Sequence, residues 1–290
     1  MRNAYQTEKE YFEGWYLKHQ KGARTLALIP GIQISRRGGR SAFLQVITNQ
    51  NAYYIDFPIE EFEPGDGFHV KIGSNTFGAE GISLDVDTSE LKLWGRLRYG
   101  PLLPVRYDIM GPFKAVPFME CSHGVLSMYH HLEGSLCLNG ETLDFQGGTG
   151  YIEKDRGRSF PKSYLWTQCN SFDGFPCSVM ASVAEIPLGG LRFPGCICAV
   201  RTKEREYRLA TYLGGKAEVW RDGLLILSQG KYRLTAEVLQ GCPQALRAPQ
   251  RGNMERTIHE HAACRMRFRF TKNGETVFDL ESASAGFEFV

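Results

Sequence analysis

The sequence has no long hydrophobic run and no apolar leader segment. No stretch approaches the roughly 20 consecutive apolar residues that a bilayer-spanning helix needs. Residues 1–10 are polar and lack the apolar core of a signal peptide. These absences predict a soluble chain without stable membrane insertion, and we expect it to be cytoplasmic.

Signature motifs of nucleotide-binding and acyl-transfer enzymes are also missing. The sequence has no GxGxxG fingerprint, no Walker-type phosphate loop, no GxSxG nucleophile elbow and no HExxH zinc motif. Charge of one sign is not in excess, because 34 basic residues stand against 32 acidic ones and the net charge is +2. A chain without a basic field or a charged tail does not attract nucleic acid, and we expect none as a partner.

Cysteine is present, but its spacing does not suggest cross-links. The 8 cysteines form no CxxC pair, and Cys137, Cys169 and Cys264 lie within strand-like runs. In a chain of 290 residues, buried reduced thiols are a simpler interpretation than a disulfide framework.

Helical periodicity is scarce, whereas a two-residue alternation of apolar and polar side chains is abundant. It is clear over residues 91–99, 231–238 and 265–270, as in strands with one buried face. Asn139-Gly140 and Asn273-Gly274 fall between strand-like runs and predict tight hairpin turns. The sequence therefore predicts an all-β protein, in which a short helix could occur only near residues 244–260.

A change of character divides the chain between residues 111 and 121, where Pro112 and Pro117 interrupt the alternation. On both sides, strand-like segments recur about every 8–14 residues, which is typical of a meander or a barrel. We therefore predict an N-terminal β-barrel-like module over residues 1–115 and a C-terminal one over residues 116–290. The two modules could share strands.

Histidines occur in two groups that invite a test for metal ligation. Residues 259–261 (His-Glu-His) would place two imidazoles on one face of an extended chain, but nothing nearby completes a metal site. A solvated loop is the better interpretation. His123 and His131 have an even spacing and could share a strand face, whereas His130 would point away. We expect hydrogen-bonding roles for these side chains and no bound metal.

Two segments combine aromatic rings with carboxyl or amide groups. In residues 11–16, a strand would direct Glu13 and Trp15 to one side and Phe12 and Tyr16 to the other. A carboxylate beside Trp is costly to bury unless it is paired or protonated. The alternative is an edge strand whose Glu13 reaches solvent.

The second segment covers residues 150–170 and has two mixed faces. In the first strand-like run, Tyr151, Glu153 and Asp155 occupy alternate positions and share one face. In the following run, Tyr164, Trp166, Gln168 and Asn170 do the same. Such faces are not expected on a solvent-exposed surface, because it would expose the aromatic rings to water. They are not expected in an apolar core either, because buried amides need hydrogen-bond partners. A ligand cavity, mostly aromatic with a few polar groups, fits them better.

These segments resemble the tocopherol cyclase family. The shared motifs are FEGWY at residues 12–16, YxEKxxGxxFP from residue 151, WxQxN from residue 166 and LRAP at residues 246–249. The resemblance spans nearly the whole chain and implies two tandem lipocalin- or calycin-like antiparallel β-barrel modules. It also implies a long isoprenoid ligand and an isomerase that closes a chromanol-type ring on a prenylated hydroquinone, without redox cofactor or metal. Arg156 stands where the family often has Trp, so the resemblance leaves the substrate open.

Ring closure of that kind needs a proton donor for a trisubstituted alkene and a wall that shields the resulting cation from water. The donor must be a carboxylic acid kept neutral in an apolar site, and aromatic faces can shield the cation. The candidate acids are Glu13, Glu153 and Asp155, with Asp155 as the predicted donor and Glu153 supporting it. The candidate substrate-binding residues are Trp15, Tyr16, Tyr164 and Trp166 as walls, and Gln168 and Asn170 as partners of the hydroquinone hydroxyls.

The sequence also allows other interpretations. The charged residues between 153 and 158 could instead form an ion-pair network that joins two barrels at their contact. The fold could also serve as a lipocalin-like carrier that binds an isoprenoid or other lipid without catalysis, or could support an unrelated reaction. We expect a small apolar, prenylated ligand as the partner, collected through no more than transient contact with a membrane.

Overall fold

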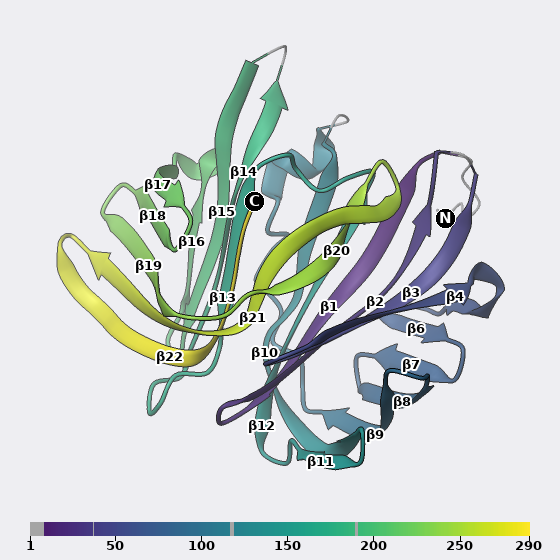
Figure 1. The fold of residues 1–290 in the computed structure, drawn as a ribbon. Coiled ribbons are helices and arrows are strands. Elements are labelled where there is room, and N and C mark those ends of the chain that lie inside the picture. The colour runs from purple at the N-terminus through teal and green to yellow at the C-terminus, as the bar shows by residue number, and fades with distance from the viewer. Residues whose placement is uncertain (1–8, 37, 117–118, 189–190) are drawn as a thin grey trace.

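The computed structural model describes residues 9–36, 38–116, 119–188 and 191–290, which form an antiparallel β protein (Figure 1). The helical elements among them are short 3-10 turns: η2 (Ile59–Glu61), η3 (Gly111–Ala115) and η4 (Thr211–Leu213). No helix in these ranges is long and apolar enough to cross a membrane. The predicted all-β fold is confirmed, whereas residues 244–260 form strands and no helix.

The first sheet has 12 strands, in the order β4-β3-β2-β1-β12-β10-β9-β8-β7-β6-β5 with β11 beside β10. Among the described residues this order is an open path, since no ladder joins β4 to β5. The bounds are β1 (Tyr11–Lys21), β2 (Arg24–Ile34), β3 (Arg40–Thr48), β4 (Ala52–Pro58), β5 (Phe62–Pro64), β6 (His69–Ile72), β7 (Asn75–Gly78), β8 (Gly81–Asp87), β9 (Lys92–Tyr99), β10 (Cys121–Leu138), β11 (Glu141–Asp144) and β12 (Gly148–Gly157).

The second sheet has 10 strands, in the order β16-β15-β14-β13-β22-β21-β19-β18-β17 with β20 beside β21. In Figure 1 it is the green-to-yellow half on the left, beside the purple-to-teal first sheet. The bounds are β13 (Tyr164–Cys169), β14 (Cys177–Leu188), β15 (Leu191–Thr202), β16 (Glu206–Ala210), β17 (Lys216–Arg221), β18 (Leu224–Gln229), β19 (Tyr232–Gln240), β20 (Gln244–Gln250), β21 (Asn253–Lys272) and β22 (Glu275–Phe289).

The change from one sheet to the other lies between Gly157 and Tyr164, which differs from the division expected at residues 115 and 116. β10 pairs with β9 and β12 pairs with β1, so residues 121–157 complete the first sheet. Pro112 lies in η3, inside the connection between the neighbouring strands β9 and β10, and Pro117 lies outside the described residues. The interrupted alternation therefore marks a long connection within one sheet.

Both predicted hairpin turns are confirmed. Asn139 and Gly140 join β10 to β11 with φ angles of 49° and 87°, and Asn273 and Gly274 join β21 to β22 with φ angles of 53° and 82°. Positive φ at both central residues is typical of the type I′ turn, whose twist matches that of the flanking strands. These turns fix the register of the two longest strands, β10 and β21, against their partners.

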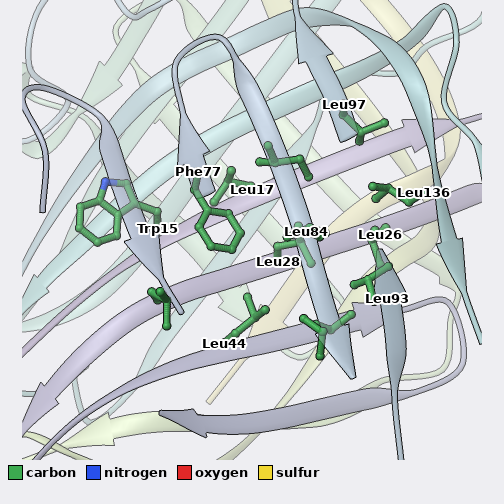
Figure 2. Close-up of a cluster of buried hydrophobic side chains, with 14 of the residues drawn as sticks. Trp15, Leu17, Leu26, Leu28, Leu44, Phe77, Leu84, Leu93, Leu97 and Leu136 are labelled. Carbon is green, nitrogen blue, oxygen red and sulfur yellow. The ribbon is translucent and has the colours of Figure 1, made fainter. Parts of the chain in front are cut away.

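Each sheet contributes a hydrophobic core made of its own residues. Figure 2 shows the core of the first sheet, where Trp15 and Leu17 of β1 lie near Phe77 and Leu84. The second sheet has an equivalent core that includes Phe268. The apolar side chains of the three alternating runs, residues 91–99, 231–238 and 265–270, are largely buried, so the periodicity identified strands correctly.

A third cluster draws side chains from both sheets, and we call this contact region the seam. It includes Tyr16 of β1 and Tyr151 of β12 from the first sheet, and Trp166 of β13 and Met180 of β14 from the second. β1 is buried along both faces as a consequence, since one face joins the first core and the other joins the seam. The seam is the part of the fold that positions the site.

Candidate active site at the seam

A cavity lies at the seam and is lined by strands of both sheets. The volume open to the centre of a water molecule is about 160 Å³, whereas one buried water needs roughly 10–15 Å³ by that measure. Much of the lining is apolar and includes Phe12, Phe43, Met110, Phe160 and Ile258. The cavity therefore lies at the contact between the two sheets, and of its lining residues only Cys196 belongs to the core of either sheet.

Six carboxyl groups line this cavity, and those of Glu120 and Glu185 are more exposed than the other four. Glu153 and Asp155 come from β12, Glu260 from β21 and Glu288 from β22. Glu153, Glu260 and Glu288 are only 5%, 3% and 6% exposed, respectively. Ionised carboxylates without partners are strongly disfavoured in such surroundings, so burial favours the neutral acids.

Each of the three glutamates accepts a hydrogen bond from a tyrosine hydroxyl. The pairs are Tyr151 with Glu153 Oε2 at 2.5 Å, Tyr16 with Glu260 Oε1 at 2.7 Å, and Tyr164 with Glu288 Oε1. In every pair one oxygen takes the hydroxyl, and the other oxygen accepts no hydrogen bond from the described residues. A carboxylic acid has this division, with one oxygen as acceptor and the other carrying the proton.

Glu153 has the most developed set of partners. Its Oε2 also accepts a hydrogen bond from Nε1 of Trp166 at 3.1 Å. Burial raises the pKa of Glu153 from 4.5 to about 7; the charge of Asp155 adds to this rise, while His123 and the Tyr151 hydroxyl oppose it. A substantial fraction of Glu153 is therefore a neutral acid at neutral pH.

His123 of β10 lies beside both carboxyl groups of β12. Its Nδ1 is 3.0 Å from Asp155 Oδ1 and its Nε2 is 3.7 Å from Glu153 Oε2. Burial alone would lower the pKa of His123, but the charges of Asp155 and Glu153 outweigh burial and raise it to about 9. The imidazole is therefore protonated at neutral pH. His123, Glu153 and Asp155 are also the group that could hold a metal ion in the described ranges, with ligand atoms within 4.8 Å of one another.

Glu260 and Glu288 lie directly opposite each other in the ladder between β21 and β22. Burial raises the pKa of Glu260 to about 7, against the opposing effects of the Tyr16 hydroxyl and the Lys18 charge. Burial also raises the pKa of Glu288 well above its ordinary range, and the charge of Glu260 raises it further. Two carboxyls in this arrangement do not both ionise at neutral pH.

Among the predicted site residues, Tyr16, Tyr164, Trp166, Glu153 and Asp155 all line the cavity. They come from three strands, β1, β12 and β13, that belong to different sheets. The alternation in the sequence correctly grouped them by strand face.

Glu13 and Trp15 lie on the opposite face of β1, which differs from their predicted roles as acid and cavity wall. Figure 2 shows Trp15 within the first core. Glu13 forms an ion pair with Lys154 and accepts a hydrogen bond from the Tyr11 hydroxyl at 2.5 Å. The Nζ of Lys154 lies 4.4 Å from the Trp15 ring centroid, so these three residues form a structural cluster away from the cavity.

Gln168 and Asn170 also differ from their predicted role, because their polar atoms join the two sheets. Gln168 Oε1 accepts a hydrogen bond from Nζ of the fully buried Lys18 at 3.3 Å. Asn170 Nδ2 donates to the carbonyl of Gly150 at 2.8 Å, and its Oδ1 accepts from Gln20 at 3.0 Å. Neither residue lines the cavity.

Glu260 and Glu288 were missed from the sequence. Residues 259–261 were expected to form a solvated loop, but they lie within β21, and Glu260 is buried. The signal was present, because every second residue from Ile258 through Phe270 faces inward, and Glu260 belongs to that series. Glu288 had no comparable signal, since residues 284–288 are buried on both faces of β22.

Solved structures with a similar fold carry very different sequences. CghA in complex with Sch210972 superposes with a TM-score of 0.60 at 9% identity, over 97% of this chain and 88% of that one. Kievitone hydratase from Nectria haematococca superposes with a TM-score of 0.55 at 9% identity, over 97% and 89%. At these identities the likeness concerns the fold alone.

Sequence comparison gives a closer relationship. Tocopherol cyclase (chloroplastic) of Zea mays is 33% identical over 95 residues, which are 32% of this chain and 19% of that protein. The matched part thus spans about a fifth of the curated relative's length. Residues 108–289, which include β10–β22 and all six carboxyl groups that line the cavity, match the tocopherol cyclase-like family. The chain belongs to the tocopherol cyclase-like family.

Proposed function

We propose that this protein is a cyclase of the isomerase type that acts on a prenylated hydroquinone by protonating an alkene. The observation that carries the proposal is Glu153, a buried carboxyl group that faces an apolar cavity and whose pKa is raised to about 7. Alkenes are weak bases, and only an acid held neutral in an apolar site can protonate them. The family relationship supports the same class of chemistry.

In this proposal Glu153 is the proton donor. The proton on Oε1 passes to the less substituted alkene carbon, and a tertiary cation forms at the other carbon. The new carboxylate keeps the hydrogen bonds from Tyr151 and Trp166 and gains the nearby imidazolium of His123. Hydrogen bonds to an ionised acceptor are stronger than those to a neutral one, so these partners stabilise the state that follows proton transfer.

Asp155 has a supporting role in this scheme, whereas the sequence had suggested it as the donor. Its Oδ1 is 3.0 Å from Nδ1 of His123, and the charge of Asp155 raises the pKa of that imidazole. Asp155 thus maintains the positive charge on His123.

Aromatic rings provide the surroundings for the cation. Tyr16 and Trp166 pack edge to face with centroids 5.4 Å apart, and Tyr164 lines the same cavity. Ring faces attract cations, and enclosure limits capture by water. The phenol oxygen then closes the ring and its proton restores the acid form of Glu153, so substrate and product have the same composition.

A carrier function needs a cavity but no acid inside it. Burial of the carboxyls at the seam lowers stability, and a carrier has no need of them. Their presence there therefore favours the cyclase. Binding without conversion is therefore the outcome that distinguishes the carrier from the cyclase.

The test is turnover of a prenylated hydroquinone by the purified protein under anaerobic conditions in D₂O. The expected product is an isomer of the substrate in which the reacting alkene is gone. It carries one deuterium bound to carbon. Glu153→Gln should lower the rate at least about a hundredfold, because general acid catalysis typically contributes that much. Glu133→Gln, an exposed position on β10, is the matched control. Saturable binding without product formation in the wild type would refute the cyclase and favour the carrier.

A further inference from the structure

Recognition of a ligand's polar head requires polar groups at the cavity, and the two amides predicted for this role do not line it. Gln168 binds Lys18, and Asn170 binds the backbone of Gly150. Besides Glu153 and the Asp155–His123 pair, the buried acidic groups at the cavity are Glu260 and Glu288, which the proposed mechanism does not use.

Resting on the proposed function, we infer that Glu260 and Glu288 together bind a free hydroxyl of the ligand and make the site select a hydroquinone over the corresponding quinone. The two carboxyls are cross-strand neighbours on β21 and β22, both are buried, and both line the cavity. Each one is oriented by a single tyrosine, since Tyr16 holds Oε1 of Glu260 and Tyr164 holds Oε1 of Glu288.

The second oxygen of each glutamate is the part left for a ligand. Neither Oε2 accepts a hydrogen bond from the described residues, although both side chains are more than nine-tenths buried. An apolar ligand in the cavity would leave both oxygens without a partner, so a bound group that hydrogen-bonds to both is favoured. The fixed tyrosine contacts mean that the carboxyls need little rearrangement to receive it.

The charge state of the pair determines which group fits. Opposed buried carboxyls do not ionise together, so the pair retains a proton and offers one donor and one acceptor. Burial raises the pKa of both carboxyls; the Tyr16 hydroxyl and the Lys18 charge oppose the rise at Glu260, whereas the charge of Glu260 adds to the rise at Glu288. Glu260 is thus the acceptor and Glu288 the donor.

A hydroxyl group matches this arrangement because it can donate to Glu260 and accept from Glu288 at the same time. A quinone oxygen accepts only, and it would leave Glu260 facing a second acceptor. A methyl ether likewise has no proton to donate. Sites built around a hydroxyl discriminate against analogues that lack it, because their own buried polar groups then stay unpaired.

The test compares three ligands by calorimetry under anaerobic conditions: a prenylated hydroquinone, its quinone and its dimethyl ether. Glu153→Gln serves as the parent protein, because the wild type would convert the hydroquinone during the titration. In this parent the Kd of the hydroquinone should be at least about tenfold lower than those of the other two. Equal Kd values for the hydroquinone and the quinone would overturn the inference while leaving the proposed function standing. Absence of binding by all three ligands would refute the proposed function, and the inference with it.

Two double variants of this parent assign the preference to these residues. Tyr16→Phe/Glu260→Leu and Tyr164→Phe/Glu288→Leu each remove both partners of a hydrogen bond, which leaves no orphaned hydroxyl behind. Each variant should bind the dimethyl ether as the parent does, and the hydroquinone no better than the quinone. Glu288→Gln, which keeps a donor, should retain the preference. A preference that persists in both double variants would overturn the assignment.

Discussion

Replacement of Glu153 by Gln tests the property on which the proposed chemistry rests, the raised pKa of this carboxyl group. A group whose pKa is higher in the folded protein than in the unfolded chain stabilises the fold at low pH and loses that contribution as the pH rises through the folded pKa. Glu153 titrates near 4.5 when unfolded and at about 7 when folded. Gln does not titrate, so the variant lacks this pH dependence.

The size of the effect follows from the two pKa values. Between pH 5 and pH 8 the folded wild type releases about 0.9 proton from this group, whereas the unfolded chain releases only about 0.2. Integrated over this interval, the linkage relation gives a loss of about 2–3 kcal/mol in the free energy of unfolding of the wild type. The free energy of unfolding of Glu153→Gln should therefore rise by about 2–3 kcal/mol relative to that of the wild type between pH 5 and pH 8.

Urea-induced unfolding at pH 5, 6, 7 and 8, followed by Trp fluorescence, measures this difference. The comparison between the two proteins cancels the titration of most other groups. Glu133→Gln on the exposed face of β10 is the control and should follow the wild type within about 0.5 kcal/mol. A difference between Glu153→Gln and the wild type that does not change with pH would refute the raised pKa and remove the basis for Glu153 as an acid.

Two further predictions concern the neighbours of this group. Asp155→Asn removes a charge that raises the pKa of His123, so NMR titration of the imidazole should give a pKa below about 9; an unshifted titration would contradict the ion pair. Gly286→Ala would place a Cβ 2.8 Å from the Trp166 ring, whereas in Gly124→Ala the nearest atom would be 3.8 Å away. Gly286→Ala should lower the free energy of unfolding by about 1–3 kcal/mol in thermal or urea unfolding, and equal stability of the two variants would count against this close approach.

Strand positions were predictable because alternation is a local property. The runs around Leu93, Leu234 and Phe268 each had one apolar face. The tight turns between strands need positive φ angles, which Asn and Gly adopt more readily than other residues. The boundary between the sheets was harder to predict. β9 and β10 are joined by a long irregular connection, whereas only residues 158–163 separate the sheets, so the more conspicuous break was the less important one.

The site was only partly predictable for a different reason. Alternation tells which residues share a face, but β1 is buried on both faces, so it could not tell which face borders the cavity. Trp15 and Tyr16 were therefore treated alike, although one lies in the first core and the other at the seam. The contact of Tyr16 with Glu260 spans 244 positions in the chain, and only the packing of the two sheets brings them together.

The separation between the cores and the cavity has a consequence for how this fold can diversify. Each sheet has a core to which the cavity residues other than Cys196 do not belong, so substitutions at the seam alter the ligand site with little effect on either core. In an ordinary single barrel the same side chains would have to support the fold and shape the ligand site. Here the two demands fall on opposite faces of β1, so selection can act on one face while the other is maintained.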